Sequence, residues 1–209
     1  MFSSFFRKPF GVGSSLNIYM FRPARIWHAL KLLFFEHKYF FARLQVIIYQ
    51  FVHPDAPWLT KTAVSYLDQH IEKQMLGFEW GSGKSTQWFA KRLEKLVSVE
   101  DDRNWYDRVR HQIAGLNVDY RFVPTETDWE SYANQILEFP DGHFDLIVVD
   151  GSCRDACIRA AVPKVRLGGM IVVDNADSQI DVSPLASLER MATDNGVWRT
   201  DIYINNITH

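Results

Sequence analysis

The sequence predicts an α/β fold: a doubly wound, mostly parallel sheet with helices on both faces, preceded by an N-terminal helical extension. Two observations lead to this prediction. From residue 75 onward, short apolar runs alternate with helical patterns, which is typical of a parallel sheet with crossover helices. Between the first run and the first helix lies a turn with two glycines, Gly81 and Gly83, of the kind that such sheets use to bind ligands.

Length and charge set the domain organisation that we expect. With 209 residues, 47% of them hydrophobic, the chain is long enough for one domain and a smaller appendage. Residues 1–58 carry seven Lys or Arg against two acids, whereas the remainder carries 16 bases and 23 acids. We therefore divide the chain into an aromatic, basic helical extension (1–57) and a main domain (58–209). The net charge of −2 gives no reason to expect a nucleic-acid partner.

A long helical pattern runs over residues 23–53. Its apolar residues recur at steps of three and four, and Pro54 ends it. The longest uncharged stretch, Leu44 to Pro54, is too short to span a bilayer. Two roles stay open for this segment: packing against the main domain or a second copy in a homodimer, or peripheral contact with a membrane surface.

Cysteine usage indicates the compartment. The chain contains two cysteines, Cys153 and Cys157, and no Cys-x-x-Cys motif. This is typical of proteins from a reducing compartment. We therefore expect a cytoplasmic protein, with peripheral location at a membrane as the alternative.

The main domain reads as strands alternating with helices. A first helix, 61–73, follows Thr60, a residue type that suits a helix N-cap. The clearest strand, 144–150, is a nearly continuous apolar run. The remaining expected strands are 75–78, 96–100, 118–123, 170–173 and 198–204, and the remaining expected helices are 85–95, 103–114, 128–138, 154–165 and 184–194.

Residues 79–85, Glu-Trp-Gly-Ser-Gly-Lys-Ser, look like a ligand-binding turn. Glycine permits a sharp bend and lets a ligand approach the main chain. A phosphate-binding P-loop would need a glycine at position 78, which is Phe78, and Gly77 is one place out. The dinucleotide pattern would need a third glycine where Thr86 stands. The pattern that does match is acid-x-Gly-x-Gly.

Four of the expected strands end in a carboxylate, at Glu79, Glu100, Asp150 and Asp174. The carboxyl ends of parallel strands share one rim of the sheet, where such sheets bind their ligands. Glu100 follows Glu79 by 21 residues, a spacing that suits an acid accepting hydrogen bonds from ribose hydroxyls. The rim is therefore the expected ligand site.

Together, Glu79-x-Gly-x-Gly, Ser-Val-Glu100-Asp101, the strand ending at Asp150-Gly and the strand ending at Asp174-Asn175 resemble class I S-adenosylmethionine (SAM)-dependent methyltransferases, over residues 58–200. The resemblance implies a Rossmann-like fold and SAM as cofactor.

The resemblance also implies roles for single residues. Glu79 would lie near the amino group of SAM, and Glu100 would hold the ribose. Thr125 or Glu126 would edge the adenine pocket. The cofactor-binding residues that the resemblance implies are Glu79, Gly81, Ser82, Gly83, Ser85, Glu100, Asp101, Thr125 and Asp150.

Asp150, Asp174 and Asn175 add a resemblance to catechol-type, Mg²⁺-dependent O-methyltransferases, whose metal is bound by an Asp after the fourth strand and an Asp-Asn after the fifth. Three oxygen ligands suit Mg²⁺, which would lower the pKa of a substrate hydroxyl. The resemblance thus implies a metal site at these three residues. The lysine expected three residues after the first Asp is replaced by Cys153, followed by Arg154.

No general base is therefore assigned. Arg154 cannot serve, because a guanidinium keeps its proton. His143 is a candidate by residue type. A second departure is at the C-terminal side of the sheet, where the family has an antiparallel hairpin. After the expected helix 184–194 only one strand's length follows, so we expect a missing last strand, or an edge covered by the N-terminal region or a second subunit.

We expect a methyltransferase that moves the methyl group of SAM to an oxygen or nitrogen of a small molecule, lipid or sugar. Two other classes are kept open. One is a P-loop-like nucleotide enzyme that uses Lys84 and Ser85. The other is a non-catalytic, membrane-associated protein that retains the fold and works through residues 23–53.

Overall fold

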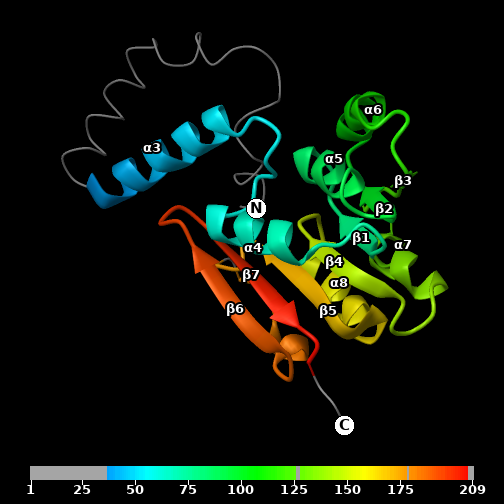
Figure 1. The fold of residues 1–209 in the computed structure, drawn as a ribbon. Coiled ribbons are helices and arrows are strands. Elements are labelled where there is room, and N and C mark those ends of the chain that lie inside the picture. Colours follow the sequence, from blue (N-terminus) through cyan, green and yellow to red (C-terminus); the bar gives the residue numbers. More distant parts are fainter. Residues whose placement is uncertain (1–36, 126–127, 178, 207–209) are drawn as a thin grey trace.

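The computed structural model describes residues 37–125, 128–177 and 179–206 (Figure 1). The expected helix 23–53 lies partly outside these ranges, and its described portion is helix α3 (His37–Val52). Glu126 also lies outside the described residues. Within those three ranges, no helix has the length and apolar character to cross a membrane.

A seven-stranded sheet forms the centre of the molecule, in the order β3-β2-β1-β4-β5-β7-β6. Strands β1 to β5 run parallel, whereas β7 pairs antiparallel with β5 and with the edge strand β6. This confirms the mostly parallel, doubly wound α/β fold. The strands are β1 (Leu76–Trp80), β2 (Lys95–Glu100), β3 (Val118–Phe122), β4 (Phe144–Val149), β5 (Val165–Asp174), β6 (Glu189–Asp194) and β7 (Arg199–Ile204).

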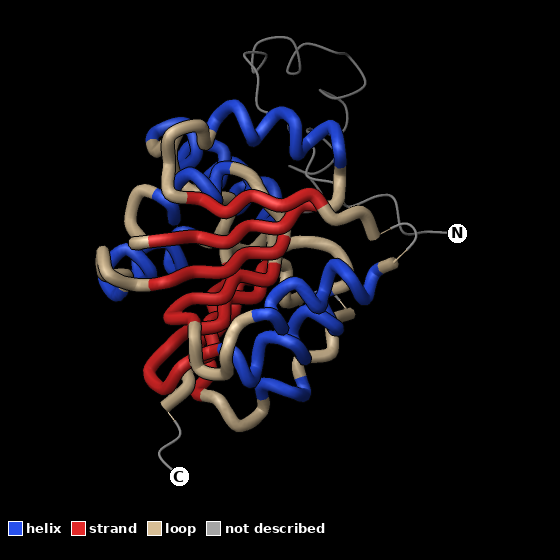
Figure 2. The backbone as a smooth tube through the Cα atoms, turned by 90° about the vertical axis from the view of Figure 1, so that its right-hand side faces the viewer, coloured by secondary structure: helices blue, strands red, loops and turns tan. Residues whose placement is uncertain are grey.

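Helices lie on both faces of the sheet (Figure 2). On one face, α7 and α8 contribute Tyr132 and Ile158 to a buried cluster, and on the other face α4 and α5 contribute Leu67 and Phe89 to a second cluster. Besides α3, the helices are α4 (Lys61–His70), α5 (Lys84–Ala90), α6 (Arg103–Gln112), α7 (Trp129–Ala133) and α8 (Arg154–Ala161), with short 3₁₀ segments η1 (Asn134–Glu138), η2 (Val162–Lys164) and η3 (Ser183–Leu185).

Strand β4 shows why the sheet is buried on both sides. Leu146 and Val148 point into one cluster and Ile147 and Val149 into the other, all of them fully buried. A strand covered on both faces needs apolar residues at every position, which is the run seen in the sequence. Burial of each such side chain contributes about 1.5–3 kcal/mol.

Several boundaries differ from those expected. The expected helix 128–138 ends as an α-helix at Ala133 and continues as the 3₁₀ segment η1. The expected helix 154–165 ends at Ala161, and residues 165–169 belong to β5, because Val165 pairs with Phe144 of β4. Thr60 caps α4 as expected, accepting a hydrogen bond from Ala63 N at 3.3 Å.

The expected helix 184–194 and the expected lack of a hairpin are both wrong. Residues 189–194 form β6, and an antiparallel hairpin with β7 completes the sheet. Asn195 and Gly196 make the turn: the Asn195 side chain accepts from Val197 N and Trp198 N, and Gly196 has a φ of +78°. The three-residue spacing of Leu185, Leu188 and Met191 resembles a helix, but pairing with β7 outweighs that local pattern.

Helix α3 lies beside the tip of this hairpin (Figure 1). A Cβ added to Gly196 would come within 2.9 Å of the Ala42 Cβ. Near the end of α3, Gln50 Nε2 donates to the Pro57 carbonyl oxygen at 3.2 Å. The division of the chain at residue 57 stays a prediction.

Candidate functional site

The two-glycine turn joins β1 to α5 in three residues, Gly81, Ser82 and Gly83. Gly81 has a φ of +85°, and a Cβ there would lie 2.7 Å from Gly151 N and 2.8 Å from the Asp150 carbonyl carbon. Any side chain at position 81 would therefore strain the backbone and displace the loop after β4. The turn therefore packs closely against the loop after β4, where β1 and β4 end.

Glu100 closes this turn from the end of β2. Its Oε2 accepts from Ser82 N at 3.0 Å and from Ser82 Oγ at 2.6 Å, while its Oε1 accepts from the Asp101 and Asp102 amides at 3.0 and 2.9 Å. Burial raises the pKa of Glu100, and the hydrogen bonds from Ser82 and Asp102 oppose that shift. Four donors occupy the four acceptor positions of this carboxylate. Tyr120 Oη lies 2.7 Å from Ser82 Oγ and extends the network.

Asp101 connects three loops at the same rim. Its Oδ2 accepts from Thr125 Oγ1 at 2.9 Å, after β3, and from Ser152 Oγ at 2.8 Å, after β4. Asp101 and Thr125 are thus brought together, as the expected adenosyl-binding residues would have to be. Asp101 is half-buried, so it is more accessible to a ligand than the buried Glu100.

Glu79 lies beneath the turn rather than on the rim, because it is inside β1 and fully buried. Its Oε2 accepts from Thr86 Oγ1 at 2.6 Å and Ser98 Oγ at 2.9 Å, and Thr86 Oγ1 in turn accepts from Gly83 N at 2.9 Å. Its Oε1 has no hydrogen-bond partner among the described residues. Burial raises the pKa of Glu79 to about 7, against the opposing effect of the hydroxyls of Ser85, Thr86 and Ser98.

These features fit SAM at the turn. An unpaired buried acceptor is costly, and a ligand ammonium group is a donor of the kind that would satisfy it. Gly81 packs its main chain against the loop after β4, which brings the turn and that loop together at the rim, and the half-buried Asp101 offers a carboxylate at the end of the next strand.

Arg154 occupies the place expected for a metal. Its Nη2 donates to the Asp150 carbonyl at 3.1 Å and to Asp150 Oδ1 at 3.3 Å, and both Nη atoms lie 3.3 Å from Asn175 Oδ1. Nη1 also donates to the Asp174 carbonyl, and Nε to the Gly151 carbonyl at 3.0 Å. One guanidinium therefore uses its donors on the loops after β4 and β5.

The expected Mg²⁺ site at Asp150, Asp174 and Asn175 does not fit this geometry. Two of the three side chains hold Arg154, and the third, Asp174, is buried and accepts from Thr200 Oγ1 at 2.8 Å. Within the described ranges, no group of three or more His, Cys, Asp or Glu side chains could hold a metal ion.

His143 is also misplaced for its expected role. It directly precedes β4, at the amino end of that strand, and its ring stacks on Phe139 at 5.3 Å between centroids. The rim lies at the carboxyl end of β4, so His143 cannot act as a base there.

Three residues of the rim were not expected: Tyr120, Ser152 and Trp105, whose indole N–H donates to the Ser82 carbonyl at 2.7 Å. Ser152 follows Asp150 by two residues, which is a signal that the sequence does contain. The approach of Tyr120 and Trp105 to Ser82 depends on the pairing of β2 with β3 and on the position of α6, which no local pattern shows.

Comparison with known proteins extends these observations. No protein-family model and no curated protein matches the chain. A methyltransferase-like protein from Silicibacter pomeroyi superposes with a TM-score of 0.54 at 17% identity, over 71% of this chain and 88% of that one. YhhF, a proposed methyltransferase from Escherichia coli, gives 0.51 at 14%, over 73% and 91%. SMU.1697c, a proposed methyltransferase from Streptococcus mutans in complex with SAH, gives 0.51 at 10%, over 67% and 94%.

Other matched structures are longer. The chain covers 48% of the YcgJ protein from Bacillus subtilis and 49% of the CurJ carbon methyltransferase. At identities this low, the likeness establishes a shared fold.

Proposed function

We propose that this chain, which has the fold of class I SAM-dependent methyltransferases, binds SAM at the two-glycine turn and transfers its methyl group to a hydroxyl oxygen of a small molecule, lipid or sugar. The observation that carries the proposal is the position of Gly81. In the order β3-β2-β1-β4-β5, the chain reverses its direction of winding between β1 and β4. Ligands bind such sheets outside the carboxyl ends of the strands at this switch point, where Gly81 meets Asp150 and Gly151.

The residues around the turn support distinct roles. The methionine part would lie against the main chain of Gly81 and Gly83, with the unpaired Oε1 of Glu79 as the acceptor nearest its ammonium group. Asp101 would accept hydrogen bonds from the ribose hydroxyls, because Glu100 already has its acceptor positions filled by the turn. Thr125, bound to Asp101, would lie at the adenosine side.

When bound, SAM would supply a methyl carbon: its bond to sulfur would break with the electron pair staying on sulfur, a bond to the acceptor oxygen would form, the hydroxyl proton would pass to water, and SAH would leave. The chain would contribute orientation, since two reactants held in line gain most of the available rate enhancement from position alone. Arg154 would contribute by fixing the Asp150 and Asn175 loops beside that position.

The test is calorimetric titration of SAH into the wild type, Gly81→Ala and Gly115→Ala. Both glycines have a φ above +80°, but a Cβ at position 115 meets nothing within 4 Å. We expect Gly115→Ala to keep the wild-type affinity and Gly81→Ala to lose at least about tenfold, or about 1.4 kcal/mol.

A second variant keeps the test informative if Gly81→Ala does not fold. Asp101→Asn keeps an oxygen for Thr125 and Ser152 but removes the charge, and we expect it to weaken SAH binding without loss of fold. A wild type that does not bind SAH or SAM, or equal affinity in all variants, would refute the proposal.

The P-loop alternative loses support from the structure. The turn is only three residues long, Phe78 at the required glycine position is buried in β1, and Lys84 Nζ lies 5.7 Å from the centre of the Trp58 ring. ATP with Mg²⁺ therefore serves as the negative-control ligand in the same titrations.

A further inference from the structure

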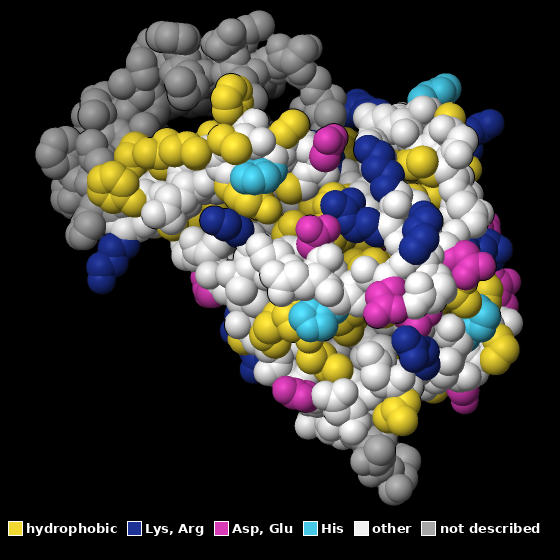
Figure 3. All heavy atoms as spheres, viewed as in Figure 1, with side chains coloured by type: hydrophobic (Ala, Val, Ile, Leu, Met, Phe, Trp, Pro, Cys, Tyr) yellow, Lys and Arg dark blue, Asp and Glu magenta, His cyan; other side chains and the backbone are white. Residues whose placement is uncertain are grey.

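Helix α3 carries an apolar stripe on its outer side. Six of the nine large apolar side chains that are exposed in the described part of the chain belong to this helix, and Phe51 is 76% exposed. At roughly 100° per residue, the six positions fall within less than half of the helix circumference. Figure 3 shows hydrophobic side chains in a row along α3. The α3 stripe consists of Phe41, Leu44, Ile47, Ile48, Phe51 and Val52.

The opposite side of α3 faces the main domain. Ala42 lies against the hairpin tip, Gln50 binds the Pro57 carbonyl, and the Tyr49 ring lies 5.9 Å from Lys61 Nζ. These inward residues are about half a turn away from the stripe. The stripe therefore points away from the main domain and has no partner within the described part of the chain.

Basic residues border the stripe. On the helical projection, Lys38 follows one edge of the stripe and Arg43 precedes the other. The helix contains no acidic residue. Long cationic side chains beside an apolar stripe are the arrangement in which the stem lies on lipid and the charge reaches the headgroups.

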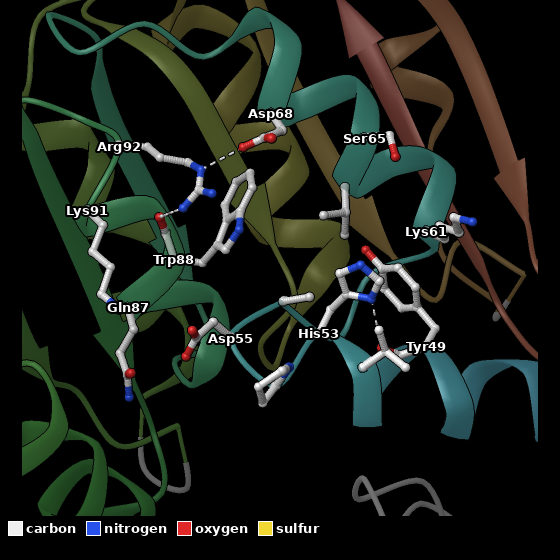
Figure 4. Close-up of a pocket in the computed structure, with 14 residues that line it drawn as sticks. Tyr49, His53, Asp55, Lys61, Ser65, Asp68, Gln87, Trp88, Lys91 and Arg92 are labelled. Carbon is white, nitrogen blue, oxygen red and sulfur yellow. Dashed lines mark hydrogen bonds and ion pairs between the residues drawn. The ribbon is translucent and has the colours of Figure 1, made fainter.

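A groove beside α3 holds further cations. It has a volume of about 660 Å³ and lies between the end of α3, the residues 53–56, α4 and α5 (Figure 4). Arg92 in this groove is paired with Asp68 at 2.8 Å, which leaves Lys61 and Lys91 against a single acid, Asp55. Figure 3 shows Lys and Arg side chains over α4 and α5 on the face that also displays the stripe.

We propose that α3 binds the surface of an anionic lipid bilayer, parallel to the membrane plane, with the α3 stripe among the headgroups and Lys38 and Arg43 at the level of the phosphates. The chemistry recognised is an apolar layer beneath a layer of negative charge. This inference does not depend on methyl transfer.

The positive charge of α3 favours an anionic lipid surface over a second copy of the chain or residues 1–36 as the partner of the stripe. In a symmetric contact between two copies, the basic residues of both helices would border the interface with no acid on either helix, which is unfavourable. Residues 1–36 of the same chain carry five bases and one acid, so they cannot neutralise the helix either. Each basic residue near the surface of an anionic membrane contributes about 1 kcal/mol to the free energy of binding.

The test is flotation of the full chain with vesicles of phosphatidylcholine, with and without phosphatidylserine. We expect the wild type to float with the phosphatidylserine vesicles and to be released by high salt. Ile48→Ser/Phe51→Ser should lower the partition coefficient at least about tenfold, since each apolar side chain contributes to insertion. Lys38→Glu/Arg43→Glu should abolish the preference for phosphatidylserine.

The matched control is Leu137→Ser/Leu167→Ser, which removes two exposed apolar side chains away from α3 and should float like the wild type. Unchanged thermal unfolding of each variant excludes a folding defect. The proposal is overturned by a wild type that does not float, or by a stripe variant that floats equally well. It is also overturned if the stripe variant converts a dimer to a monomer, or if amide exchange shows the stripe protected in a lipid-free monomer.

Discussion

Glu79 is a buried acid with one oxygen unpaired among the described residues, and its pKa makes the stability depend on pH. Burial raises this pKa from 4.5 to about 7, so between these values the unfolded chain is ionised while the folded chain holds the proton. Unfolding then releases a proton, and Glu79 lowers the free energy of unfolding progressively as pH rises through this window. Above it, the loss is complete and amounts to about 3 kcal/mol.

We therefore expect Glu79→Gln to be more stable than the wild type above pH 7, and the difference to vanish toward pH 4.5. Glutamine keeps an oxygen for the Thr86 and Ser98 hydroxyls and carries no charge. Urea unfolding of both proteins across this pH range measures the difference. A constant difference at all pH values would contradict the assignment of a raised pKa.

Arg154 joins two loops of the rim, and its removal should be costly. Arg154→Met leaves the carbonyl oxygens of Asp150, Gly151 and Asp174 without this donor, and we expect a loss of about 3 kcal/mol in the free energy of unfolding. The control is Arg103→Met, which removes an exposed ion pair with Asp107 and should change stability by less than about 0.5 kcal/mol.

A second measurement tests whether the oxygens that bind Arg154 also bind a metal ion. Added Mg²⁺ should leave the thermal unfolding of the wild type unchanged, because the guanidinium holds the Asp150 and Asn175 oxygens. An Arg154→Met protein as stable as the wild type would contradict the structural role, and stabilisation of the wild type by Mg²⁺ would contradict the occupied site.

Single residues of the rim were predictable to different degrees. Gly81 and Glu100 were identified because a glycine turn and an acid after the second strand leave a pattern in the sequence. The sequence did not show that Glu100 binds Ser82, nor that Arg154 reaches Asn175, because each contact joins segments that meet only after the sheet forms. Glu79 was assigned to the rim because an acid at the end of an apolar run looks exposed.

At the scale of elements, the hairpin β6–β7 is the clearest difference between the sequence prediction and the structure. The Asp-Asn-Gly sequence at 194–196 is a strong hairpin signal, and it lies between two runs of strand length. The apolar spacing over 185–191 favoured a helix instead, since a short edge strand with one buried residue, Thr193, has little alternation.

A chain of buried hydroxyls ties this hairpin to α4 and to the rim. Thr200 Oγ1 accepts from Thr60 N at 3.2 Å and donates to Asp174 Oδ1 at 2.8 Å, while Thr193 Oγ1 donates to the Thr200 carbonyl at 2.6 Å and pairs with Thr60 Oγ1. The N-cap of α4 therefore contacts both strands of the hairpin.

We expect Thr200→Val to lose about 2 kcal/mol in the free energy of unfolding, because a methyl group replaces the hydroxyl that serves Thr60 and Asp174 in a site without solvent access. Thr62→Val on the exposed side of α4 should change stability by less than about 0.5 kcal/mol. Chemical denaturation measures both, and equal effects would show that the buried hydroxyl chain adds nothing.

At the scale of the whole molecule, two surfaces have different proposed roles. The rim at the switch point holds the proposed cofactor site, and the outer side of α3 holds the proposed membrane contact (Figure 1). The alternation of strands and helices let the sequence predict the sheet. The sequence left the role of α3 open, since an amphipathic helix reads alike whether its apolar side meets protein or lipid.

The strand order β5-β7-β6 has a consequence for biosynthesis. β6 is made before β7, yet it lies outside it and touches the sheet only through it. As the chain leaves the ribosome, neither β5 nor β6 can acquire its last neighbour until residues 199–204 have emerged. Completion of the sheet must therefore wait until β7 has been made, and a nascent protein stalled before that point would expose two unsatisfied strands to its surroundings.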